Sequence, residues 1–360
     1  MKPSVSIPLL LLPCALAIGA AAQTSSVPES RTQTRYSIGV IDDATFYAGL
    51  PARAPATLNR LLLEPSLGLK LDNRLTLSTS LIEVSTTRDH TASQVLVREG
   101  YAGLSAGDFD LTAGRKMVRW GTGYAFTAAG VLDPPRIPTD PSDRLNLNEG
   151  RDMVKVDWIH GPHALSAAWS TAALARSGTH MRDTAAFRYN VLVHGFDTAL
   201  IAGNDRGGDS FGALTFTRVM GQAWEIHGEA AWREQAAVLL GAKYTMASGV
   251  TFIGEFFTPP NTPYFSSGVP LSAGRQHYAF VNAGKTRLRE LPGWKEWDVS
   301  AGMVANLDDH STTGVADVNR WFGKHVSAYL HLEVPNGSRN SQYGAAPYTA
   351  ATSLGLRFQL

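Results

Sequence analysis

The sequence has almost no cysteine, since Cys14 is the only one among 360 residues. Cys14 falls in an N-terminal stretch that carries one cation, Lys2, then an apolar run, then small residues at Ala20 and Ala22. This arrangement is typical of a secretory signal peptide, and the apolar run is too short for a membrane helix. We therefore expect residues 1–22 to be removed on export.

An acylated Cys14 is the alternative, because lipoprotein signals also carry a cysteine. Pro13 stands before it where a small residue is needed, and the apolar stretch continues beyond it, so this alternative is less favoured. A mature chain without Cys14 has no thiol. Disulfides, thiolate catalysis and cysteine metal sites are then excluded.

The chain also lacks an excess of charge and, after the signal, a long apolar run. Lys plus Arg number 32 and Asp plus Glu 31, so removing Lys2 leaves 31 of each. A neutral chain has no general electrostatic attraction for nucleic acid, so we expect no nucleic-acid partner. We also expect no cofactor. No later stretch approaches the roughly 20 apolar residues of a spanning helix. A soluble exported protein and a membrane β-barrel remain.

Segments that alternate apolar and polar residues recur to the end of the chain. In the clearest, 224–233, the even positions are apolar or glycine, whereas Glu225, His227, Glu229 and Arg233 fall at odd positions. The polar face would be the solvated outside of a soluble sandwich or the lumen of a membrane barrel.

Lys155 and Asp157 alternate with Val154, Val156 and Trp158 in the same way. In a barrel, we expect Lys155, Asp157, Glu225, His227, Glu229 and Arg233 to face the lumen, as side chains in water. Residues two apart on a strand are separated by about 7 Å, so their spacing alone does not indicate a metal site.

Turns and tryptophans favour the barrel. Short turns such as Gly161-Pro162 and Gly323-Lys324 are interleaved with longer connections, as in outer-membrane barrels with short turns at one rim. Four tryptophans lie within a few residues of a short turn or of Pro292-Gly293, which we place at the same rim, and they would suit a membrane interface because indole has an apolar body and one donor. These are Trp158, Trp224, Trp297 and Trp321.

The chain ends on an alternating segment, 353–360, in which Leu354, Leu356, Phe358 and Leu360 share a face. This ending resembles the C-terminal signature of Gram-negative outer-membrane β-barrels, although that signature ends on an aromatic residue and here Phe358 lies two positions earlier. The resemblance implies an all-β, antiparallel, up-and-down transmembrane barrel in the bacterial outer membrane. It implies contact with outer-membrane lipid and lipopolysaccharide.

Counting strands back from a periplasmic C-terminus gives about 18, with 16 as the alternative, because such barrels have even numbers. A first strand near 36–41 satisfies the parity. We therefore expect a periplasmic segment over 23–34 and one barrel over 35–360. The first three external loops are then expected at 42–57, 86–93 and 119–149.

The third of these loops is the longest stretch without strand periodicity, and so long a connection is usually functional or disordered. Trp120, Tyr124, Phe126, Leu145 and Leu147 can bury surface, which favours an ordered loop. In general porins, which this topology resembles, the third loop folds into the barrel and narrows the pore. We expect residues 119–151 to form such a constriction.

The charges of this loop have both signs, and charge rings at a constriction select solutes. The candidate residues are Arg119, Asp133, Arg136, Asp140, Asp143, Arg144, Glu149 and Arg151. An internally paired structural loop is the alternative. Gly114-Arg115-Lys116 through Trp120-Gly121 also resembles a strand end of alginate-export-like and substrate-specific porins.

Three possible chemical motifs have simpler explanations. Ser105, in Gly-Leu-Ser-Ala-Gly, fits a nucleophile elbow, but a strand follows where the elbow needs a helix. His160 and His163 flank a Gly-Pro turn with no adjacent third metal ligand. The Asp308-Asp309-His310 triplet fits a polar hairpin tip. No metal site or catalytic residue is expected.

Three hypotheses follow. The first is a channel for passive diffusion of small hydrophilic solutes, either as a monomer or as a homo-oligomer. The second is a plugged, non-conducting barrel that serves envelope assembly, anchoring or export. The third, an outer-membrane hydrolase, would depend on Ser105 or His310.

Overall fold

The computed structural model describes residues 32–360 except 52–55, 73, 89–90, 141–142, 146, 172–182, 206–209, 234, 260–275 and 289–292. The expected signal peptide 1–22 and most of segment 23–34 lie outside the described residues. The described part of the chain forms strands and no helix, so the all-β prediction is confirmed. Accordingly, none of it is a helix long and apolar enough to cross a membrane.

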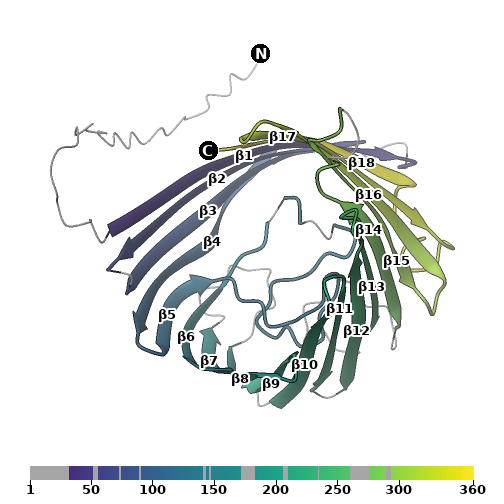
Figure 1. Ribbon diagram of the computed structural model, residues 1–360. Helices are drawn as coiled ribbons and strands as arrows, with labels where there is room; N and C mark the ends of the chain where they lie inside the picture. The colour runs from purple at the N-terminus through teal and green to yellow at the C-terminus, as the bar shows by residue number, and fades with distance from the viewer. Residues whose placement is uncertain are drawn as a thin grey trace, which may run out of the picture. The chain divides into compact units, whose positions relative to one another are not determined.

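In the described part of the chain, eighteen antiparallel strands form one closed sheet (Figure 1). Each pairs with its neighbours in the sequence, and β1 also pairs with β18, where Val40 lies opposite Phe358. Closure leaves no unpaired edge, and the prediction of 18 strands is confirmed. The strands are β1 Thr32–Ala48, β2 Thr57–Leu71, β3 Leu75–Thr87, β4 Thr91–Ala106, β5 Phe109–Lys116, β6 Arg151–His160, β7 His163–Thr171, β8 Thr184–Val193, β9 Phe196–Asp205, β10 Ser210–Met220, β11 Trp224–Trp232, β12 Ala236–Thr245, β13 Thr251–Thr258, β14 Tyr278–Lys285, β15 Trp297–Asn306, β16 Ser311–Phe322, β17 Val326–Asn336 and β18 Ala350–Gln359.

The two faces of the sheet differ as the alternation predicts. On β11, Trp232 lies on one face and is 61% exposed, whereas His227 and Glu229 lie on the other face and are 1% and 2% exposed. Leu200 on β9 and Leu214 on β10 lie opposite each other and are both exposed. The outer face is therefore apolar, and we call the opposite side of the sheet the inward face.

Two rims follow from the connections. At one rim the turns are mostly short, and glycines such as Gly107 and Gly161, with φ of 60° and 57°, supply the left-handed backbone that tight turns need. We call this the short-turn rim. The opposite, long-loop rim carries the connection 117–150 between β5 and β6 and the connection 337–349 between β17 and β18.

The expected ends of the first strands and loops need correction. The first strand extends to Ala48 rather than ending near residue 41, so the first connection is 49–56. Asp43, which we expected in the first external loop, lies on β1 at the inward face and is paired with Arg60 at 2.6 Å. Partner strands on both sides, rather than local pattern, decide where β1 ends.

Trp321 does not share the position of the other rim tryptophans. It lies on the inward face of β16, where its indole Nε1 donates to Asp298 Oδ2 at 2.7 Å. Trp224 is half exposed on the outer side. An interfacial position is therefore supported for Trp224 and wrong for Trp321, because an indole can also satisfy its donor inside the barrel.

Candidate functional site

The connection 117–150, which we call the long loop, runs across the inside of the ring of strands in Figure 1. It leaves the end of β5 and returns at the start of β6. Much of it is buried, and its contacts reach β11 and β13 on one side and β17 and β18 on another. Its bounds differ from the expected 119–151, because Arg151 is the first residue of β6.

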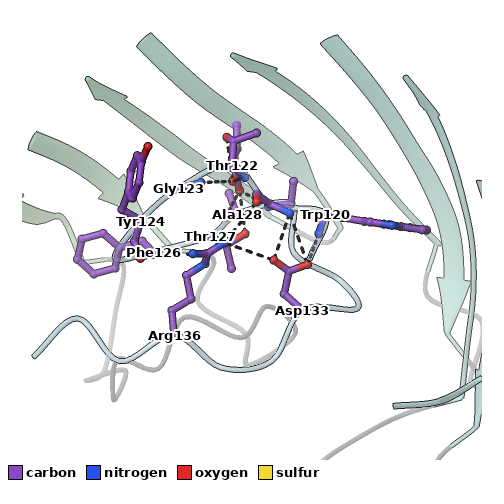
Figure 2. Close-up of polar contacts among 12 residues, drawn as sticks. Trp120, Thr122, Gly123, Tyr124, Phe126, Thr127, Ala128, Asp133 and Arg136 are labelled. Atoms are coloured by element: carbon purple, nitrogen blue, oxygen red, sulfur yellow. Dashed lines mark hydrogen bonds and ion pairs between the residues drawn. The ribbon is translucent and has the colours of Figure 1, made fainter. Parts of the chain in front are cut away.

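We call residues 117–136 of the long loop its first arm and residues 137–150 its second arm. The carboxylate of Glu229 on β11 holds the first arm. Oε1 accepts from the backbone amides of Thr122 and Gly123, the latter at 3.0 Å, and Oε2 accepts from those of Ala128 and Ala129 at 2.6 and 2.7 Å (Figure 2). The Thr122 and Thr127 hydroxyls also donate to it, at 3.2 and 3.0 Å. Hydrogen bonds to an ionised acceptor are about twice as strong as neutral ones. One buried carboxylate therefore fixes the backbone at both ends of 122–129.

Glu255 on β13 holds the middle of the same arm. Its carboxylate accepts from the amides of Tyr124, Ala125 and Phe126, the last two at 2.9 and 3.2 Å. The His227 ring nitrogen Nε2 lies 3.0 Å from Glu255 Oε1. Both partners are buried, so this site is dry and lies at the wall of the barrel.

These contacts correct the expected environment of Glu229 and His227. We expected both side chains to stand in water on a lumen-facing strand, but they are 2% and 1% exposed. A buried carboxylate must be hydrogen-bonded or neutralised, and the loop amides satisfy Glu229. Glu225 and Lys243 meet the Tyr124 hydroxyl instead, at 2.8 and 3.2 Å.

Asp133 joins the start and the end of the first arm by hydrogen bonds within the loop. Its carboxylate accepts from the amides of Trp120 at 2.6 Å and Gly121 at 3.2 Å, and Arg136 lies 3.6 Å away (Figure 2). Arg136 also donates to the carbonyls of Gly121 and Tyr124. Burial raises the pKa of Asp133 to about 6, against the opposing effects of the Trp120 amide and Arg136.

A large apolar cluster lies under this arm. The strands from β6 to β15 each contribute at least one buried residue, and Phe126 of the loop stacks on Phe257 with ring centroids 4.9 Å apart. The loop members are Val118, Trp120, Ala125, Phe126, Ala128, Ala129, Val131 and Leu132. Apolar packing of this kind excludes water from that side of the barrel.

The second arm of the long loop is tied to the wall near the closure of the barrel. Arg144 donates to Ser353 on β18 at 3.2 Å and pairs with Asp140 at 3.3 Å, and Arg357 donates to the Arg144 carbonyl. Leu145 packs in a second apolar cluster with residues of β1, β2 and β3. The loop therefore joins two separate walls of the barrel.

Ion pairs also fix the base of the loop. Arg115 pairs with Asp152 at 2.6 Å and with Glu149 at 3.3 Å. The Gly150 amide donates to the Arg98 carbonyl at 2.8 Å. Much of the expected charge in this region is therefore engaged in holding the loop, as the alternative of an internally paired loop proposed.

The remaining candidates are dispersed. Lys155 and Asp157 pair with each other on β6, and Arg233 pairs with Asp205 at 2.5 Å. Arg119 and Asp143 border a cavity of about 500 Å³ on the side of β1 to β4. Sequence reasoning missed Arg357, which borders both this cavity and another of about 430 Å³ beside β13 to β18.

The motifs with simpler explanations behave accordingly. Ser105 lies in a β-hairpin, two residues before a turn at Gly107. His160 contacts Asp108 and His163 contacts the Tyr189 hydroxyl, each at 2.8 Å, so the two imidazoles have separate partners. His310 ends the turn between β15 and β16. Within the described ranges, no three His, Asp, Glu or Cys residues are grouped to hold a metal.

A closed barrel of 18 antiparallel strands with an apolar outer face is the fold of outer-membrane porins. Solved structures with this fold include OccK11 (OpdR) of Pseudomonas aeruginosa, at a TM-score of 0.63 and 9% identity over 91% of this chain and 96% of that one. OccAB4 of Acinetobacter baumannii matches at 0.63 and 9% over 93% and 100%. P. aeruginosa OpdK, solved with vanillate, matches at 0.62 and 10% over 91% and 98%.

No family model matches the chain, and no curated protein matches it. At 7 to 10% identity the structural likeness establishes the fold. The predicted porin-like barrel fold is confirmed.

Proposed function

We propose that the protein is an outer-membrane channel for passive diffusion of small hydrophilic solutes, with the long loop folded into the lumen as its constriction. The observation that carries this proposal is the pair of buried carboxylates, Glu229 and Glu255, that hold the loop backbone against β11 and β13. An irregular backbone is tolerated at membrane depth only where it is buried in protein or lines a water-filled cavity.

The route for solute lies beside the apolar cluster rather than through it. Packed apolar side chains cover the side from β6 to β15. Polar residues border the two cavities, among them Asn282, Asp298 and Asp317 on β14 to β16 beside one, and Glu64 and Arg98 beside the other. A channel that is narrow, off-centre and lined by both signs of charge favours small polar solutes over simple cations or anions.

The outer-membrane location, the lipid and lipopolysaccharide contact, the cleavage of residues 1–22 and a homo-oligomeric state belong to the same proposal. The exposed apolar residues of the outer face support the membrane location, because an 18-stranded barrel in water would leave them solvated. P. aeruginosa opdK, which has the same fold, is described as an outer membrane protein.

The proposal is tested by the conductance of a variant in which the two carboxylates that hold the long loop, Glu229 and Glu255, are both changed. The double variant E229Q/E255Q loses the charge on both carboxylates and places amide donors against the loop amides, so the first arm should detach. In planar bilayers we expect its single-channel conductance to rise roughly twofold or more over wild type, as expected when an ordered constriction leaves a 16- to 18-stranded pore.

Asp197→Asn is the matched control, because Asp197 is likewise a carboxylate of the wall, on β9, but is hydrogen-bonded to Asn190 near the short-turn rim and not to the long loop. It should conduct like wild type. Equal conductance in E229Q/E255Q and wild type would mean that the loop does not constrict the pore. Absence of conductance in all three proteins, with a partner that co-purifies, would favour the plugged barrel for envelope assembly, anchoring or export.

A further inference from the structure

A second connection at the long-loop rim also folds onto the wall of the barrel. It comprises residues 337–349 between β17 and β18, and we call it the outer loop. Ser341 is 3% exposed, and Tyr343 packs against the apolar cluster. A loop that merely extended from the rim would leave both side chains in solvent.

Gln342 makes the central contacts of the outer loop. Its carboxamide oxygen accepts from the Tyr278 hydroxyl on β14 at 2.7 Å and from Asn306 Nδ2 on β15 at 2.9 Å. Its backbone amide donates to Asp309 Oδ2 at 2.7 Å, and the next amide, of Tyr343, donates to Ser311 Oγ at 3.2 Å. Gln342 therefore ties the outer loop to β14, β15 and the turn after β15, and the neighbouring Tyr343 amide ties it to β16.

The loop backbone also approaches β16 closely. Gly337 has φ of 150°, and a Cβ at this position would lie 2.7 Å from Ser311 Cβ. At its other end the Tyr348 hydroxyl donates to Glu333 at 3.0 Å, and its ring contacts Tyr47. The two ends are thus fixed, and Gln342 holds the part between them.

The closed position is incompletely satisfied. The Gln342 side-chain nitrogen is buried and has no hydrogen-bond partner among the described residues, and the same holds for Thr313 Oγ1 on β16. Leaving a buried donor unpaired costs free energy. In an open position of the loop, water would supply the missing hydrogen bond. Polar contacts with an unpaired donor at their centre therefore cost less free energy to open than fully paired contacts would.

The outer loop stands at the rim end of the wall that borders the 430 Å³ cavity. Asn282, which lines that cavity, is on β14 with Tyr278, and Asp317 is on β16 with Ser311. Side chains two apart on a strand face the same way, so these residues lie below the outer loop on one inward face. A solute entering along this wall would pass under the outer loop.

We propose that the outer loop is a gate at the β14 to β16 side of the mouth, and that Gln342 is its latch. This inference rests on the proposed channel function. The polar contacts of the gate, with β14, β15, β16 and the turn at Asp309, differ from those that hold the long loop, although Tyr343 packs against the apolar cluster that long-loop residues share.

Thiol labelling and conductance together test the gate. Cys14 is the only cysteine in the sequence, so Ser341→Cys in a Cys14→Ser background places one thiol at a buried position of the outer loop. Adding Gln342→Ala should speed its reaction with a membrane-impermeant maleimide roughly tenfold, about the effect of losing one net hydrogen bond. In planar bilayers, Q342A should spend a larger fraction of time at the higher conductance level.

Two further variants keep the test interpretable. Asn340→Ala changes an exposed residue of the same loop and should behave like wild type. Tyr278→Phe removes only one hydroxyl donor and should give a smaller change in the direction of Q342A. It replaces Q342A if that variant does not fold.

Unchanged labelling in a conducting Q342A protein would overturn the latch. Faster labelling with unchanged conductance would show a moving loop that does not gate, and would overturn the gate while leaving the channel intact. A wild-type protein that does not conduct would overturn the proposed function itself, and the gate with it.

Discussion

At the scale of single residues, the carboxylates on the inward face have different roles set by their surroundings. Glu229 and Glu255 satisfy loop amides, whereas Asp133 accepts from two amides within its own loop. Burial raises the pKa of Asp133 to about 6, so its protonated form is favoured in the folded loop compared with the unfolded chain.

The raised pKa of Asp133 predicts that the stability of the folded protein falls as the pH rises. Its ordinary pKa is 3.8, so its raised pKa gives a contribution to stability that is complete below about pH 4 and is lost as pH rises through 6. The shift of about two units corresponds to at most about 3 kcal/mol. Asp133→Asn keeps an acceptor for the Trp120 amide and removes the titration.

Thermal unfolding at pH 4.5 and pH 7.5 measures this contribution, as the difference between wild type and D133N. Wild type should lose stability relative to D133N as the pH is raised. A constant difference between the two proteins across this range would mean that Asp133 is not protonated in the folded loop.

At the scale of elements, the two arms of the long loop are held by different forces. Carboxylates and an apolar cluster hold the first arm, and the second arm depends on Arg144 and on Leu145 packed with Ile41, Leu62, Ile82 and Val84. Loss of the second arm should therefore leave the first in place.

Leu145→Ala tests this separation. Truncating a buried leucine costs about 2–5 kcal/mol, and most of that cost should appear as local release of the second arm. Hydrogen exchange should become faster over residues 137–150 and stay unchanged over 122–129. Ile137→Ala, at a half-exposed position in the same loop, is the control. Faster exchange in both arms would show that the loop moves as one unit.

The sequence predicted the strands better than the loop for a physical reason. The alternation at 224–232 reports which face each side chain takes, and antiparallel parity converts the strands into a closed count of 18. Glu229 could be placed on the inward face, but its partners lie about 100 residues earlier in a stretch without periodicity. Charge type alone does not distinguish a solvated carboxylate from a buried anchor.

At the scale of the whole molecule, the apolar outer face distinguishes a membrane barrel from a soluble one. Leu200 and Leu214 lie opposite each other on β9 and β10, and they are 57% and 42% exposed. In water a change at such exposed positions has little effect on stability. In a bilayer, the same positions contact hydrocarbon.

Leu200→Arg should therefore have little effect on folding in water and a large effect in a bilayer. A cation on the lipid face of a membrane barrel costs about 2–4 kcal/mol near the bilayer midplane, so we expect less folded L200R than wild type in lipid vesicles, measured as the band that shifts on heating before gel electrophoresis. Thr217→Arg changes a half-buried residue of the adjacent β10 on the inward face, where a cation can remain in water, and should fold like wild type. Equal folding of L200R and T217R would contradict the membrane orientation of the barrel, and the proposed passage of solutes through its interior would then lack its physical basis.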